Sequence, residues 1–85
     1  MVKFQYTIKD AEGIHARPAG ILVKAAAEFP CQVMLEKDGK SVDAKRIFGV
    51  MSLGVKCNEE VVIICDGEQE EEALEKISAV LKENL

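Results

Sequence analysis

Residues 2–9 alternate between apolar and polar side chains, and this alternation limits what the chain can fold into. Successive side chains of a β-strand point to opposite faces, so the pattern predicts a strand with one buried face. Such a strand requires a sheet whose apolar side is covered by another layer. The apolar residues of this segment are Val2, Phe4, Tyr6 and Ile8.

A helix is predicted next, because apolar residues then recur at spacings of three and four. Pro18 fits the first turn of a helix and no later turn, so the helix is expected to begin at about Ala16 and to end before Pro30. Its apolar stripe consists of Ala19, Leu22, Ala26 and Phe29.

Shorter elements follow. Residues 31–35 alternate as a second strand, and Asp38-Gly39 predicts a tight hairpin into a third strand over residues 40–43. The apolar residues 47–53 predict a short helix, which Gly54 is placed to stop.

The β-branched run 61–65 is typical of a central strand, and Asp66-Gly67 turns the chain into a last helix. The expected fold is therefore a single α+β domain over residues 1–85, in the order βαββαβα. Four antiparallel strands would be covered on one face by three helices. The inward face of the last helix is expected to consist of Ala73, Leu74, Ile77, Val80 and Leu81.

The second helix is too short to bury all of its apolar residues. Core packing is expected to take up Ile47, Val50 and Leu53. That leaves Phe48 and Met51 as candidates for an exposed docking patch, since apolar clusters on a surface often mark protein interfaces.

The only histidine of the chain lies in the segment Gly13-Ile14-His15-Ala16-Arg17-Pro18. The first N–H groups of a helix, from Ala16 onward, have no intrahelical partner, and together with the helix dipole they form an anion site. His15 would lie at the mouth of this site. The positive helix end and Arg17 favour a neutral, nucleophilic ring.

A neutral ring nitrogen can accept a phosphoryl group, and Arg17 with the free N–H groups can then bind its oxygens without a metal. Gly13 would let the loop turn tightly beside the ring. A lone histidine is, however, more often a surface or capping residue. The residues alone leave a phosphate-linked role and a capping role both open.

The amount and distribution of charge bear on which partners the chain can bind. The net charge of −4 argues against a nucleic acid partner, since phosphate binding needs a basic surface. Charge is uneven: residues 1–58 hold nine Lys and Arg against six Asp and Glu, and residues 59–85 hold two against nine. The basic half could steer acidic partner proteins toward His15, or its lysines could simply be solvated; its cations near the site are Arg17, Lys24, Lys45, Arg46 and Lys56.

Neither a metal nor another cofactor is expected. The three cysteines, Cys31, Cys57 and Cys65, lack CxxC spacing and are interpreted as buried or bystander thiols. The longest apolar run, residues 61–65, is too short for a membrane span, and the N-terminus has no apolar signal segment. A cytoplasmic monomer is therefore expected.

Two segments, GIHARPA at residues 13–19 and RIFGVMSLGV at residues 46–55, closely resemble the histidine-containing phosphocarrier HPr of the bacterial sugar phosphotransferase system. The resemblance covers essentially the whole chain and implies an open-faced β-sandwich. It implies that His15 takes a phosphoryl group on Nδ1 from phosphorylated enzyme I and passes it to the IIA components of sugar transporters. Arg17 would contact the phosphoryl group.

The resemblance also implies that both partners dock on one shared surface, so that carrying is sequential. The residues that match this surface are Gly20, Lys24, Ala27, Ile47, Phe48 and Met51.

Arg46 departs from the pattern. Many Gram-positive members of the family carry a regulatory serine at this position, and arginine cannot accept phosphate. The resemblance therefore implies that this chain lacks the serine switch, with Ser41 and Ser52 as weak substitutes. An HPr-like regulatory module, acting through protein contacts alone, is the alternative to a carrier. Family members of that kind often lack the histidine, so His15 favours the carrier.

Overall fold

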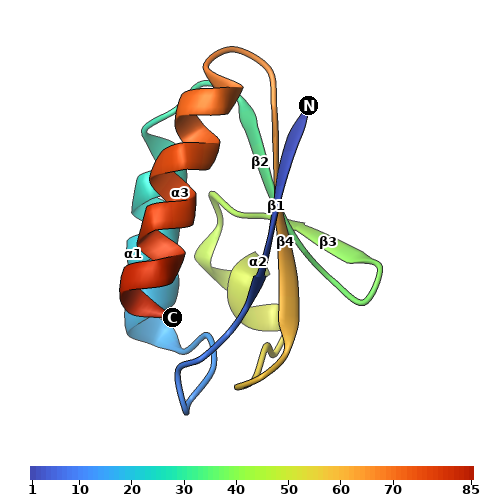
Figure 1. Ribbon diagram of the computed structural model, residues 1–85, viewed down its shortest axis with the longest axis vertical. Helices are drawn as coiled ribbons and strands as arrows, with labels where there is room; N and C mark the ends of the chain where they lie inside the picture. Colours follow the sequence, from blue (N-terminus) through green and yellow to red (C-terminus); the bar gives the residue numbers. More distant parts are fainter.

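The computed structural model describes residues 1–85 and contains one four-stranded antiparallel sheet and three helices (Figure 1). The strands lie in the order β1-β4-β2-β3, so β4 is a central strand, as its composition predicts. The element order βαββαβα is confirmed. The elements are β1 (Val2–Thr7), α1 (Ala16–Ala27), β2 (Gln32–Lys37), β3 (Lys40–Asp43), α2 (Ile47–Ser52), β4 (Glu60–Asp66) and α3 (Glu70–Asn84).

The hairpin between β2 and β3 forms at the predicted dipeptide. Asp38 and Gly39 both have positive φ, 51° and 83°, while Lys37 pairs with Lys40. Positive φ at both central residues is the condition for a type I′ turn, whose twist matches that of the flanking strands. The dipeptide therefore sets the register of β3 on β2.

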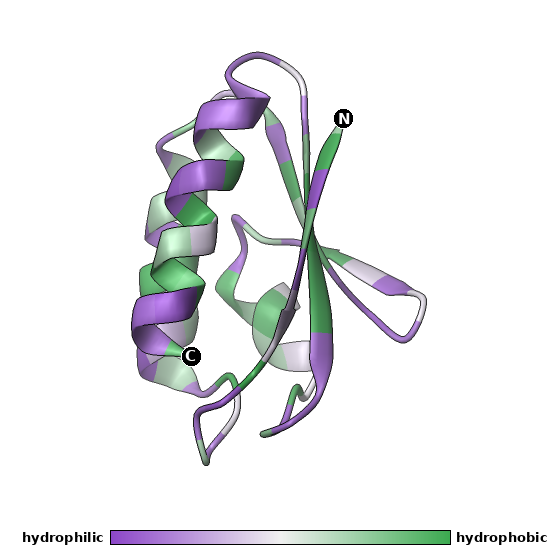
Figure 2. Cartoon of the chain, in the orientation of Figure 1, coloured by the Kyte–Doolittle hydropathy of each residue, from purple (hydrophilic) through white to green (hydrophobic).

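The core lies between the sheet and the helices, with α1 and α3 side by side on one face (Figure 1). In register, Phe4 of β1 faces Ile63 of β4, which faces Leu35 of β2, and Ile63 and Leu35 are completely buried. Only alternate residues of β4 point inward; Val62 and Ile64 lie half-exposed on the other face. Bands of hydrophobic and hydrophilic residues alternate along α3 (Figure 2).

The predicted inward residues of α1 and α3 are confirmed, with Phe29 and Leu74 only half-buried. The prediction for α2 is wrong in one respect. Val50 is buried and Leu53 packs against the core, but Ile47 is exposed. A helix of six residues has room for one fully buried position, and Val50 occupies it.

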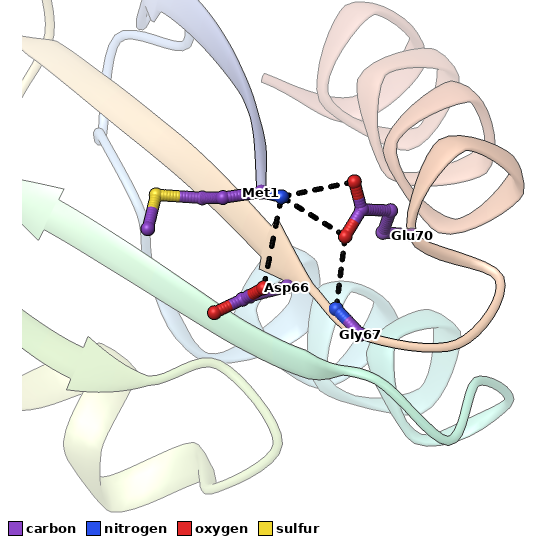
Figure 3. A network of polar contacts seen from close by, with 4 residues as sticks. All are labelled: Met1, Asp66, Gly67 and Glu70. Atoms are coloured by element: carbon purple, nitrogen blue, oxygen red, sulfur yellow. Dashed lines mark hydrogen bonds and ion pairs between the residues drawn. The ribbon is translucent and has the colours of Figure 1, made fainter.

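A cluster of polar groups ties β1 to the start of α3 (Figure 3). The Met1 ammonium donates to both carboxylate oxygens of Glu70, at 3.1 and 3.0 Å, and lies 3.6 Å from Asp66 Oδ1. Glu70 Oε1 also accepts the Gly67 N–H at 2.9 Å. That N–H and the Met1 ammonium lower the pKa of Glu70, and the hydrogen bond to Glu70 raises the pKa of the Met1 amine.

No helix combines the length and the hydropathy that spanning a membrane requires.

Candidate functional site

The helix α1 begins at Ala16, as predicted, and His15 is its N-cap residue. The backbone of His15 is extended, with φ −103° and ψ −175°, and its carbonyl accepts the N–H of Ala19 at 3.0 Å. The imidazole makes no capping hydrogen bond. Capping therefore does not account for this side chain, and the ring is available for other chemistry.

The first turn of α1 has free donors next to the ring. The N–H groups of Ala16 and Arg17 donate to no group of the chain, and Pro18 has no N–H. No acidic residue lies in this turn, and Lys24 is in the last turn. The open amides and the positive end of the helix dipole make this turn suited to an anion.

Gly13 has positive φ, 68°, as the predicted tight turn requires. A second constraint is visible only in the structure. A Cβ at this position would overlap the carbonyl oxygen of Val55 and lie 2.7 Å from Lys56 Cα. The N–H of Ile14 donates to that same carbonyl at 3.0 Å. The loop that carries His15 is thus pressed against the segment before β4, and only glycine fits there.

The ring opens onto a hollow of about 280 Å³ at the end of the molecule where α1 begins. The His15 side chain is 37% exposed, so a visiting protein can reach it. Arg17 also lines the hollow, is exposed, and forms no ion pair. Its guanidinium is free to bind phosphoryl oxygens. The lining residues are Asp10, His15, Arg17, Pro18, Ile21, Glu83 and Asn84.

Two carboxylates flank the imidazole, and the sequence analysis overlooked both. His15 Nε2 lies 3.5 Å from Asp10 Oδ2, and His15 Nδ1 lies 3.5 Å from Glu12 Oε2. These are ion-pair separations, longer than a hydrogen bond. The acidic residues could have been noticed at −5 and −3 from the histidine. Glu83, which lines the same hollow, could not have been noticed in this way because it lies near the other end of the chain.

The residues predicted to dock partners lie on the exposed faces of α1 and α2. The two helices contact each other, and a Cβ at Gly20 would be 3.9 Å from Ile47 Cδ1. Lys24 and Ala27 are exposed on α1. On α2, Phe48 is 87% exposed. Its helix neighbours Ile47 and Met51 are 38% and 39% exposed. Ile21 of α1, which the sequence prediction left out, is also exposed.

Arg46 is the N-cap residue of α2 and makes no capping hydrogen bond through its side chain. Its Nε lies 3.7 Å from Asp43 Oδ2, and the side chain is largely exposed. The weak substitutes for a regulatory serine differ in environment. Ser52 Oγ donates to the Gly49 carbonyl at 2.6 Å, and Ser41 is exposed in β3.

None of the three cysteines lines the hollow at His15. Cys31 and Cys65 are buried and Cys57 is half-buried, and none forms a disulfide. Burial raises the pKa of Cys65 to about 11, which keeps it a thiol at neutral pH. No three or more side chains of His, Cys, Asp or Glu gather in a way that could hold a metal ion.

Comparison with known proteins agrees with this geometry. The family model described as "PTS HPr component phosphorylation site" matches residues 2–83. The chain belongs to the HPr family. It is 46% identical over 85 residues to the HPr-like protein Crh of Bacillus subtilis, covering all of both chains. It is also 46% identical over 85 residues to the phosphocarrier protein HPr of Mycoplasma genitalium, covering 99% of this chain and 97% of the relative.

Solved structures of the HPr family share the fold. The histidine-containing phosphocarrier protein of a mycoplasma matches with a TM-score of 0.94 at 32% identity, covering 96% of this chain and 93% of that one. A crystal structure of Crh, described as a domain-swapped dimer, matches with a TM-score of 0.78 at 46% identity, covering 100% and 98%. The open-faced arrangement predicted from the resemblance is therefore confirmed.

Proposed function

We propose that this HPr-family chain is a phosphocarrier of the sugar phosphotransferase system. His15 takes a phosphoryl group from phosphorylated enzyme I and passes it to IIA components of sugar transporters in the cytoplasm. One observation carries the proposal: an accessible imidazole lies at the N-terminus of α1 beside an unpaired Arg17 and two free amides. Those groups can hold three phosphoryl oxygens without a metal.

Partners would dock on the surface formed by the exposed faces of α1 and α2. Phe48 offers a large aromatic side chain with Ile47 and Met51 beside it, which is the composition of an interface centre. Lys24 and Arg46 add positive charge at its border. An acidic partner surface with an apolar centre is therefore the complement of this face.

The test is phosphorylation by the phosphotransferase components themselves. The protein is mixed with enzyme I and phosphoenolpyruvate, and its intact mass is measured. One phosphoryl group is expected, labile in acid and stable in base, and it should be lost on addition of a IIA component. A sample without phosphoenolpyruvate is the control. Absence of the label in the complete mixture would remove the carrier role.

A regulatory module is the second candidate, and Arg46 favours it together with the identity to Crh. The same docking surface would then modulate a transcription factor or enzyme without transferring phosphate. The two candidates differ in what the protein captures. Binding of a regulator with no binding of any IIA component would favour the module, and the converse would favour the carrier.

We infer that the carrier acts as a monomer. All six residues of β1 pair with β4, and the Met1 ammonium donates to Glu70. Domain swapping, as described for the Crh dimer, would have to break these contacts if it exchanged β1. Light scattering after gel filtration tests this: a mass of one chain is expected, and a mass of two contradicts it.

A further inference from the structure

The two carboxylates beside His15 differ in how firmly they are held. The Asp10 side chain is 29% exposed and the Glu12 side chain 74%. Asp10 Oδ1 accepts the Glu12 N–H at 2.8 Å, and the Asp10 carbonyl accepts the Gly13 N–H at 2.9 Å. The Asp10 N–H donates to the main-chain oxygen of Leu85, also at 2.9 Å. Asp10 is fixed on three sides, whereas the carboxylate of Glu12 accepts no hydrogen bond.

This asymmetry distinguishes the two ring nitrogens. A carboxylate stabilises a proton on the nitrogen that it faces, and the fixed carboxylate of Asp10 faces Nε2. The carboxylate facing Nδ1 belongs to Glu12, which is free to move into solvent. Two further charged residues, Arg17 and Glu83, line the same hollow as the ring.

We propose that Asp10 is a positioning residue, which keeps the proton of the neutral imidazole on Nε2 and leaves the lone pair of Nδ1 as the nucleophile. The proposal rests on the carrier function and identifies, from this structure, a residue that selects the reacting nitrogen.

The transfer step balances without proton loss from the ring. The Nδ1 lone pair forms a bond to phosphorus while the bond between phosphorus and the donor breaks, and that electron pair leaves with the donor. The ring then carries a positive charge and keeps its proton on Nε2, opposite the negative charge of Asp10. When an acceptor takes the phosphoryl group, the electrons of the N–P bond return to Nδ1.

The variant Asp10→Asn separates charge from loop structure. The Asn carbonyl can still accept the Glu12 N–H, as Asp10 Oδ1 does, so the turn is kept. The carboxylate facing Nε2 becomes an amide, which donates to a bare nitrogen and therefore favours the proton on Nδ1. Asp38→Asn is the matched control: it makes the same charge change in the β2–β3 hairpin, which lies far from the start of α1 (Figure 1).

The primary measurement is the tautomer of His15, from the 15N chemical shifts of its two ring nitrogens at about pH 9, well above the reference pKa of a free imidazole. The native protein and Asp38→Asn should be protonated mainly on Nε2. In Asp10→Asn the ratio of the two tautomers should shift toward Nδ1–H by about fivefold. This is the change in an equilibrium that corresponds to the interaction of one unit charge at this distance in water. This measurement needs no phosphoryl donor.

The second measurement is the rate of phosphorylation by enzyme I and, separately, by phosphoramidate. Asp10→Asn should slow both by one common factor, equal to the fall in the fraction of rings that present a free Nδ1 and therefore at most about fivefold. Glu12→Gln should keep the native tautomer.

A native ring protonated mainly on Nδ1 overturns the proposal without any variant. An unchanged ratio of the two His15 tautomers in Asp10→Asn also overturns it. The same holds if the tautomer ratio shifts in Glu12→Gln but not in Asp10→Asn. Failure of enzyme I to phosphorylate the native protein would instead count against the carrier function, whatever the tautomer.

Discussion

The two ends of the molecule each place a nitrogen group between two carboxylates, and they use the arrangement differently. At one end the Met1 ammonium lies between Asp66 and Glu70 (Figure 3). At the other, the His15 ring lies between Asp10 and Glu12. The start of α3 marks the first end and the start of α1 the second (Figure 1).

Distance and hydrogen bonding separate the two clusters. Glu70 is held by the ammonium at 3.0 Å and by the Gly67 N–H at 2.9 Å, so the Met1 cluster is closed. Around His15 both contacts are 3.5 Å and neither is a hydrogen bond. A closed cluster contributes to stability, whereas a loose one leaves its ring nitrogens accessible to a reacting group. We expect variants at the His15 end to change chemistry and variants at the Met1 end to change stability.

The largest effect is expected from His15→Ala. Phosphoryl acceptance from enzyme I should be lost entirely, because no other side chain offers a ring nitrogen. The free energy of unfolding should stay within about 0.5 kcal/mol of the native value, since the ring makes no cap and no hydrogen bond. Intact mass and urea denaturation measure the two quantities. Phosphate on the variant would mean that the acceptor lies elsewhere.

Arg17→Ala should slow phosphoryl transfer without changing the fold. Loss of a charge-assisted contact of about 1.5–3 kcal/mol corresponds to a rate lower by about 10-fold to 150-fold. Rapid-quench kinetics with enzyme I measure the rate. Arg17→Lys keeps the positive charge but loses the forked pair of N–H donors. Its rate of phosphoryl transfer should lie between those of the native protein and Arg17→Ala. A native rate in Arg17→Ala would show that the free guanidinium does not meet the phosphoryl group.

Gly13→Ala tests the tight packing between the His15 loop and Val55. Both Gly13 and Gly54 have positive φ, 68° and 58°, but a Cβ at Gly54 meets nothing within 4 Å. Gly54→Ala should therefore cost about 1–2 kcal/mol of stability for the backbone conformation alone. Gly13→Ala should cost about 2–5 kcal/mol, because overpacking against Val55 is added. Equal losses in urea denaturation would contradict the tight fit.

Phe48→Ala should weaken docking rather than folding. The side chain is 87% exposed, so unfolding should change by no more than about 0.5 kcal/mol. Removal of an aromatic side chain at an interface centre costs about 1–2 kcal/mol, which raises the Kd for enzyme I about 5-fold to 30-fold. Isothermal titration calorimetry measures this Kd. A native Kd for enzyme I in Phe48→Ala would show that the docking surface lies elsewhere.

The smallest effect is expected from Glu70→Gln, at the Met1 end. The pKa of Glu70 is lowered, so its contribution to stability is present above its usual value of 4.5 and is lost as the pH falls through the lower folded value. The pKa of the Met1 amine is raised, so its contribution is present below 8.0 and is lost as the pH rises through the higher folded value.

The melting temperature of Glu70→Gln should therefore fall slightly below native between these limits, and the gap should close at more acidic and more alkaline pH. Phosphoryl transfer should be unaffected. Glu71→Gln, at a neighbouring residue without an ion pair, is the matched control. A loss that is constant with pH would mean that the charges of this cluster do not stabilise the fold.

Local patterns predicted most of the fold. The alternation in β1, the apolar stripe of α1 and the Asp38-Gly39 turn each depend on residues close in sequence, and each was found where predicted. The error at Ile47 has a physical reason. Periodicity identifies an apolar residue of a helix but not how much of that helix the rest of the molecule covers.

The site divides in the same way. Sequence alone predicted the segment from Gly13 to Pro18 as the candidate site, because the start of a helix, the free amides and the spacing of His15 and Arg17 are properties of consecutive residues. Tertiary structure alone decided that Val55 restricts residue 13, that Glu83 lines the same hollow as His15 and that Met1 is held by Glu70. Those contacts join residues far apart in the chain, and only packing of the helices on the sheet brings them together.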